Sequence, residues 1–135
     1  QRNTLFTGLS MEENLIFGTN SSTEDLISLL SKYPQMKSVL LQENSMSTFL
    51  NRVYDGTNAS GGQKRIIINL RGVLRSKAFQ SLIVILDEPT DSLDKTSSEY
   101  IYKAIRQLQK SKTVICISHD AKMPSLFDRT YEMNS

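Results

Sequence analysis

The stretch Leu82-Ile83-Val84-Ile85-Leu86-Asp87-Glu88 decides the fold of this chain, because an unbroken apolar run is followed directly by two acids. A strand that is apolar at every position is typical of a parallel sheet covered on both faces. The sequence therefore predicts a central strand over residues 82–86. Asp87 and Glu88 follow at its carboxyl end, where open parallel sheets bind their ligands.

A second apolar run, Thr113 to Ile117, predicts the next parallel strand. The segment between the runs predicts a helix, for which Thr96 and Glu99 fit a capping box. Its core-facing stripe consists of Ile101, Ala104, Ile105 and Leu108. The three elements together predict a βαβ unit, and we expect Arg129 to Met133 to add a last strand.

The segment Ala59-Ser60-Gly61-Gly62-Gln63 lies upstream of the first strand. Ser60 and Gln63 fit a capping box at the start of a helix that runs to about Lys77. Glycine has no Cβ, so a phosphate can approach the backbone amides of Gly61 and Gly62 closely, where the helix start concentrates partial positive charge. The apolar stripe of this helix is Ile66, Ile67, Leu70, Val73 and Leu74.

The first part of the chain predicts further helices. A helix begins near Ser22, and Leu26, Leu29, Leu30 and Tyr33 form its apolar face. Pro34 interrupts it and starts a second short helix through Leu41. Residues 42–58 are polar, with Asp55-Gly56 as a turn signal, and we expect them to be the most mobile part of the chain.

Composition limits the classes of function. The 135 residues, 39% of them hydrophobic, suffice for one modest core. The net charge of +2 is scattered, so we expect no nucleic-acid partner. No apolar run reaches the roughly 20 residues of a membrane span. The single Cys116 has no disulfide partner, which suits a reducing compartment, and is expected to be a small core residue.

These motifs resemble the ATP-binding domain of the ATP-binding-cassette superfamily, whose signature usually reads Leu-Ser-Gly-Gly-Gln where this chain has Ala59 to Gln63. The resemblance implies an α/β fold: part of a P-loop NTPase-type parallel sheet, here a βαβ unit, plus an α-helical signature subdomain. The expected division is residues 1–78 for the Q-loop, helical subdomain and signature helix, and 79–135 for the core. No Gly-x-x-x-x-Gly-Lys-Ser/Thr phosphate loop occurs in the chain, and we expect that element upstream of Gln1.

The resemblance implies roles in ATP hydrolysis. Asp87 would hold Mg²⁺, usually through water, and Glu88 would polarise the water that attacks the γ-phosphate. His119, in Ile117-Ser118-His119-Asp120, is similar to the switch histidine that contacts the γ-phosphate. Gln1 is similar to the Q-loop glutamine, which senses Mg²⁺ and the attacking water.

Nucleotide binding is implied for a second set of residues. Ser60, Gly61, Gly62 and Gln63 would close over an ATP held by the partner domain of a head-to-tail dimer. Asp94, in the D-loop-like Asp91-Ser92-Leu93-Asp94, would cross the same dimer seam, and it can also cap the following helix. Because Ala59 replaces the usual Leu, we expect looser packing of this segment and slower turnover.

The leading hypothesis is therefore the ATPase domain of a membrane transporter, using ATP and Mg²⁺ on the cytoplasmic face of a membrane. Its partners would be a second ATP-binding domain and transmembrane domains, with the Phe6-containing loop as the expected contact. One alternative is a soluble cassette ATPase of chromosomes or ribosomes, although the long coiled coil of chromosome-maintenance members is absent here. Another alternative is a non-catalytic truncated cassette. The chain alone is expected to have little ATPase activity.

Overall fold

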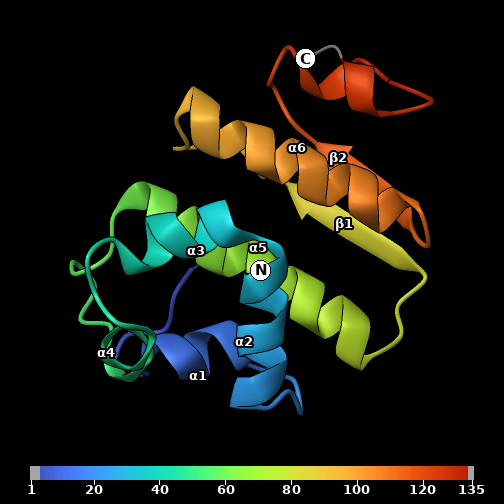
Figure 1. The fold of residues 1–135 in the computed structure, drawn as a ribbon. Coiled ribbons are helices and arrows are strands. Elements are labelled where there is room, and N and C mark those ends of the chain that lie inside the picture. The colour runs from blue at the N-terminus through green and yellow to red at the C-terminus, as the bar shows by residue number, and fades with distance from the viewer. Residues whose placement is uncertain (1–3, 134–135) are drawn as a thin grey trace.

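A computed structural model describes residues 4–133. A helical region and a two-stranded parallel sheet with its crossover helix lie side by side (Figure 1). Helix α5 ends at Ala78, and the predicted division of the chain at residues 78 and 79 stays a prediction. The helical region contains α1 (Met11–Ile16), α2 (Thr23–Lys32), α3 (Pro34–Leu41), α4 (Met46–Asn51) and α5 (Gly61–Ala78), and the second region contains β1 (Ile83–Asp87), α6 (Lys95–Gln109), β2 (Thr113–Ile117) and the 3₁₀ helix η1 (Met123–Leu126).

The helices predicted to start near Ser22, Pro34 and Ser60 all form, and the helical region contains two more, α1 and α4. Helix α2 starts at a capping box between Ser22 and Asp25, and α3 has Pro34 in its first turn. Helix α4 lies inside the polar stretch that was expected to be the most mobile part of the chain. Ser45 caps it and Phe49 anchors it in the core, so two local signals sufficed to form a short helix there.

Helix α5 is the central element of the molecule. It contacts α1, α3 and β1, and four members of its predicted apolar stripe, Ile66, Ile67, Leu70 and Leu74, are buried, while the fifth, Val73, is half-buried. The core cluster continues from this stripe into the buried face of α6, where Ile101 and Ile105 lie. One core therefore joins the two regions, and it fixes the start of α5 relative to the strands.

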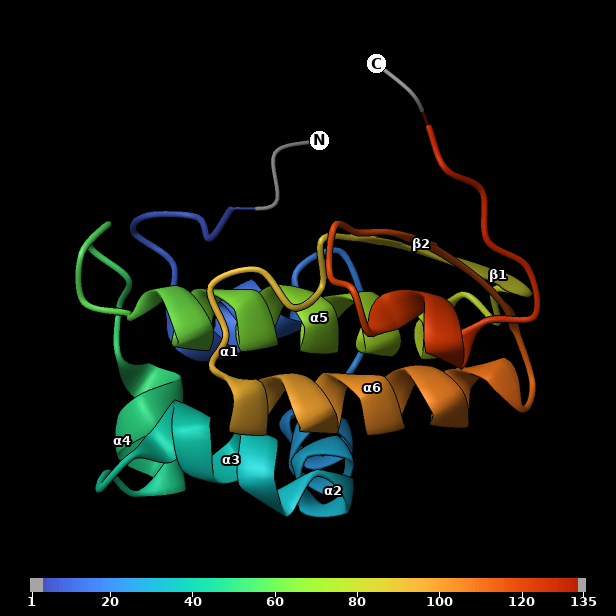
Figure 2. The same cartoon turned by 90° about the horizontal axis from the view of Figure 1, so that it is seen from above.

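The βαβ unit is confirmed, because β1 pairs with β2 in parallel from Ile83↔Thr113 to Asp87↔Ile117. The prediction of a central strand covered on both faces is wrong for the described residues, in which the sheet has two strands. Both α5 and α6 lie on the same side of the strands (Figure 2). Val84 points to that side and is buried, whereas Ile83 and Ile85 on the other side are exposed.

Three details after β1 differ from prediction. Helix α6 starts at Asp94, whose carboxylate accepts a hydrogen bond from the Ser97 amide; the Thr96–Glu99 capping box is wrong, because Glu99 instead pairs with Lys122. Residues 129–133 form no strand and are exposed. Cys116 is half-buried rather than fully buried, and burial raises the pKa of its thiol to about 11.

Within residues 4–133, every helix is too short or too polar to cross a bilayer.

Candidate functional site

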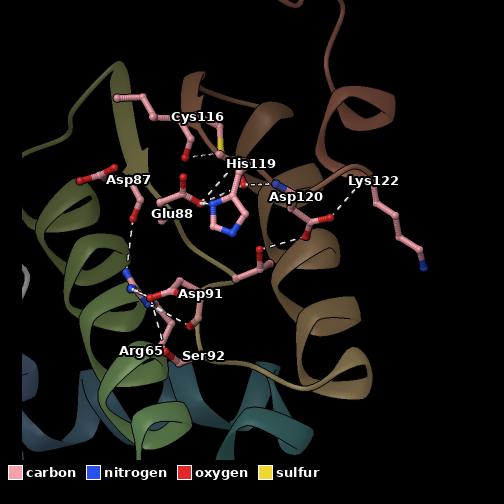
Figure 3. A network of polar contacts seen from close by, with 12 residues as sticks. Arg65, Asp87, Glu88, Asp91, Ser92, Cys116, His119, Asp120 and Lys122 are labelled. Carbon is pink, nitrogen blue, oxygen red and sulfur yellow. Dashed lines mark hydrogen bonds and ion pairs between the residues drawn. The ribbon is translucent and has the colours of Figure 1, made fainter. Parts of the chain in front are cut away.

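Two loops meet at the carboxyl end of the sheet. Residues 88–94, the β1 loop, follow the first strand, and residues 118–122, the β2 loop, follow the second. Because β1 and β2 are parallel and in register, both loops emerge at the same edge, and the amide of Glu88 donates to the carbonyl of Ile117 at 2.8 Å. This contact places Glu88 beside His119, as Figure 3 shows.

Glu88 and His119 form an ion pair, with His119 Nδ1 at 3.0 Å from Glu88 Oε2. The same oxygen accepts from the Ser118 hydroxyl at 3.3 Å and from the His119 amide at 3.4 Å. Among the described residues no hydrogen bond reaches the second oxygen, Oε1, which leaves it to accept a proton. The hydrogen bond to Glu88, then its charge, raises the pKa of His119 above its ordinary value.

The backbone of the β1 loop is strained at two positions. Glu88 has φ 47° and Ser92 has φ 63°, values in the left-handed region that non-glycine residues rarely adopt. Such residues cost about 1–3 kcal/mol each and persist only where the surrounding contacts hold them. Strain at a carboxylate on the ligand-binding edge of a sheet is typical of a functional site.

Asp87 is the exposed last residue of β1. In residues 4–133 no three His, Cys, Asp or Glu side chains gather to form a metal cage. Mg²⁺ often binds to one or two carboxylates while keeping waters and phosphate oxygens as its other ligands, and the single Asp87 carboxylate fits that mode. The second predicted ligand, Gln1, lies outside the described residues.

The start of α5 forms the predicted capping box. Ser60 Oγ accepts from the Gln63 amide, and Gln63 Oε1 accepts from the Ser60 amide, both at 3.1 Å. Helix geometry leaves the amides of Gly61 and Gly62 without partners inside the helix, and the start of α5 is exposed at Gly61. Gln63 itself is buried and donates from Nε2 to the carbonyl of Leu40 at 2.9 Å, so its side chain is used within the fold, and its predicted contact to a nucleotide stays a prediction.

The β1 loop packs across this helix start. A Cβ at Gly61 would lie 3.4 Å from Ser92 Cβ, and one at Gly62 would lie 3.6 Å from Leu93 Cδ2. Both distances are ordinary van der Waals contacts, so the loop lies directly against the helix start and leaves room for no more than a Cβ at either glycine. No hydrogen bond or ion pair in the described residues joins the Ser60–Gln63 segment to Glu88 or His119, so the site has two separate parts.

Arg65 and Asn69, which the sequence analysis did not single out, fasten the β1 loop to α5. Arg65 pairs with Asp91 at 2.9 Å and also donates to the carbonyls of Asp91 and Asp87. Asn69 Nδ2 donates to the carbonyl of Pro89 at 2.9 Å. Their spacing of four residues, which puts two polar groups beside the apolar stripe on one face of a helix, was the available signal.

Asp94 is used within the chain. Its carboxylate caps α6, and the hydrogen bond from the Ser97 amide, followed by one from the Ser97 side chain, lowers its pKa. The predicted role at a dimer seam stays a prediction.

Several known proteins are similar to the chain in sequence, although no protein-family model matches it. ABC transporter B family member 3 of Dictyostelium discoideum is 32% identical over 121 residues, which are 89% of this chain and 8% of that protein. An ATP-dependent lipid A-core flippase of Vibrio vulnificus is 33% identical over 102 residues, covering 76% and 16%. The chain spans 8% to 22% of the length of such curated relatives.

Solved structures with the same fold include a dimeric ATP-binding cassette in a post-hydrolysis state with ADP and Pi. It superposes with a TM-score of 0.61 at 25% identity and covers 93% of this chain and 53% of its own. A bacterial Atm1-family ABC exporter with ATP bound gives a TM-score of 0.70 at 17% identity, over 91% and 21%. At 17% identity the likeness concerns the fold alone.

Proposed function

The chain belongs to the ATP-binding-cassette (ABC) superfamily as part of a nucleotide-binding domain, and from this premise we propose that it supplies hydrolytic residues to an ATPase that drives transport across a membrane. The observation that carries the proposal is the Glu88–His119 pair at the carboxyl end of a parallel strand. Exporters and flippases among the relatives support transport as the process that the ATPase drives.

In the proposed reaction, Glu88 is the general base. Its Oε2 is engaged by Ser118 and His119, so the free Oε1 can orient a water and accept its proton as the water attacks the γ-phosphate of ATP. Exposed His119, charged at neutral pH more often than an ordinary histidine because Glu88 raises its pKa, stabilises negative charge on the transferred phosphoryl group.

Asp87 would hold Mg²⁺ through one carboxylate, and the ion would neutralise charge on the phosphate oxygens. The role proposed for Gln1 as a second contact to this ion rests on the sequence resemblance.

The start of α5 is proposed to act on a second nucleotide-binding domain. The free amides of Gly61 and Gly62, with the Ser60 hydroxyl, suit the γ-phosphate of an ATP bound by that partner in a head-to-tail dimer. Asp94 follows Leu93, whose side chain lies near Gly62, and is proposed to contact the partner. This arrangement explains why the signature segment and the Glu88–His119 pair are separate parts of the site.

Transmembrane domains are the other proposed partner, which would place the domain on the cytoplasmic face of the membrane. The proposed contact is an aromatic pair, Phe6 and Phe17, with ring centroids 4.2 Å apart and about two fifths of each residue exposed. Arg71 lies 5.3 Å from the centre of the Phe6 ring, which holds this pair against α5.

The substitution Glu88→Gln, made in the full-length protein, tests whether Glu88 is the general base. Gln keeps the size of Glu88 and an acceptor for His119 but cannot take a proton, so phosphate release from Mg²⁺-ATP is expected to fall about 10²–10⁴-fold. Binding of a fluorescent ATP analogue should persist. Asp128→Asn, at an exposed carboxylate, is the control. Turnover that survives Glu88→Gln would refute the proposal.

Ser60→Arg tests the action on a partner domain. The long charged side chain blocks the helix start, so we expect loss of turnover at an ATP site whose phosphate loop belongs to another domain, measured in dimers that mix variant and wild-type protein. Ser60→Thr keeps a capping hydroxyl and serves as the control. Unchanged activity at the partner's site with Ser60→Arg would show that this segment does not act in trans.

A further inference from the structure

Asp120 follows His119 directly, and its carboxylate is fully engaged. Oδ2 accepts hydrogen bonds from the Thr90 hydroxyl at 2.9 Å and from the Tyr102 hydroxyl, while Oδ1 accepts from the Lys122 amide at 3.0 Å. The amide of Asp120 also donates to Ser118 Oγ at 3.1 Å. Figure 3 shows the Asp120 side chain turned away from Glu88, toward α6.

The partners of Asp120 come from different parts of the fold. Thr90 is buried in the β1 loop, two residues after Glu88, and Tyr102 is buried on α6. Burial, then the hydrogen bond to Asp120, raises the pKa of Tyr102 to about 12, so its hydroxyl stays a donor at neutral pH. The hydroxyls of two buried residues, Thr90 and Tyr102, therefore fix the position of the Asp120 carboxylate.

His119 has no comparable support of its own. Its side chain is 79% exposed, and the β2 loop that carries it has no regular secondary structure before η1. Its contacts to Glu88 run through one carboxylate oxygen. Its position relative to Glu88 thus depends on what holds the β2 loop.

The geometry points to Asp120 as a positioning residue for the proposed ATPase: by fastening the β2 loop to Thr90 and Tyr102, it holds His119 against Glu88. This inference rests on the proposed function. Asp120 acts through His119 and does not itself need to touch ATP. Thr90 belongs to the β1 loop and Asp120 to the β2 loop, so the hydrogen bond between them also joins the two loops of the site.

The test measures ATP hydrolysis by the full-length protein carrying the substitution Asp120→Ala. We expect kcat to fall about tenfold or more with little change in KM for ATP, because a catalytic group displaced by about 1 Å can lose that much. Asp120→Asn keeps the shape and one acceptor, which can serve Thr90 and Tyr102, but it turns an NH₂ toward the Lys122 amide, so its kcat should lie between those of Asp120→Ala and the wild type. Asp128→Ala, the same change at an exposed carboxylate, is the control and should hydrolyse ATP normally.

A double variant separates positioning from general damage. If Asp120 acts through His119, Asp120→Ala should cost nothing further in a His119→Ala background. An equal fold-loss in both backgrounds would overturn the inference. Tyr102→Phe, which removes one donor and keeps the ring, should lower kcat in the same direction by a smaller factor, and an unchanged kcat would likewise count against it.

Amide hydrogen exchange provides a readout that does not depend on ATP hydrolysis. In Asp120→Ala the His119 amide should exchange about tenfold faster, because the β2 loop opens more often, whereas Asp128→Ala should leave it unchanged. Unchanged protection in Asp120→Ala would overturn the positioning role even if the protein hydrolyses ATP. If the His119 amide exchanges faster in Asp120→Ala but the wild-type protein does not hydrolyse ATP, the positioning role of Asp120 is supported and the proposed function is refuted.

Discussion

The helical region, residues 4–78, and the strand region, residues 79–133, bury their apolar side chains differently. In the helical region the apolar stripes face one another, and Ile67 at the centre of α5 has no exposed surface. In the strand region the crossover helix covers one face of the sheet, and Ile85 on the other face is 66% exposed. The exposed set also includes Leu82, Ile83, Ile115 and Ile117. A βαβ unit with two strands covers only half of its sheet.

Polar groups show the same contrast. Buried Arg71 in the helical region donates to the carbonyl of Asn14 at 2.6 Å, to Asn14 Oδ1 at 3.2 Å and to the carbonyl of Thr4 at 3.1 Å. In the strand region the charged pair, Glu88 and His119, lies at a solvent-facing edge. The helical region thus provides most of the closed core, while the strand region holds reactive groups where a ligand can reach them.

The largest expected effect within this comparison comes from Ile67→Ala. Deleting a fully buried Ile side chain leaves a cavity in the core, so the free energy of unfolding should fall by about 2–5 kcal/mol. Urea unfolding of the 135-residue chain measures it. A loss below about 1 kcal/mol would mean that the helical core is not tightly packed.

A smaller effect is expected from Arg71→Met, which removes three donors to carbonyl oxygens but keeps the length of the side chain. The buried acceptors lose a charged partner, and the expected destabilisation is about 2–3 kcal/mol in the same urea assay. Burial lowers the pKa of Arg71 to about 10, so relief of its desolvation offsets part of the loss. Lys77→Met, on the exposed end of α5, is the control; an equal effect there would remove any special role for Arg71.

The smallest effect is expected from Ile85→Ala. The side chain is exposed, so the change should alter the stability of the 135-residue chain by less than about 1 kcal/mol, most of it from strand propensity. The same stability measurement on Ile85→Ala in the full-length protein then shows whether this side chain is exposed there too. A loss there as large as that of Ile67→Ala would show that another part of the protein covers this face of the sheet.

The sequence predicted most of the elements, because their signals are local. Ser22, Pro34 and Ser60 mark helix starts, and the unbroken apolar runs mark β1 and β2. Helix α4 was missed because its stretch is mostly polar. The start of α6 was placed two residues late because Asp94 and Thr96 can both cap a helix, and only the course of the β1 loop decides between them.

The candidate site was less accessible to sequence reasoning. Glu88 and His119 are far apart in the chain, and resemblance to a family pointed to both before the parallel register brought them together. Arg65 and Asp120 were not predicted, because their roles depend on which loop lies beside them. The open face of the sheet is the opposite of the prediction, because an unbroken apolar run favours cover on both faces, and among the described residues only one face is covered.

Gln63 constrains how this segment can vary over evolutionary time. Its side chain accepts a hydrogen bond from Ser60 at one end and donates one to the carbonyl of Leu40 at the other. Glu keeps the acceptor but, when ionised, has no hydrogen for Leu40, whereas Lys and Arg can donate but cannot accept. Ala59 makes no such hydrogen bond through its side chain but is buried in the core, so we expect its position to accept only small apolar residues, whereas Gln63 is restricted by its two hydrogen bonds.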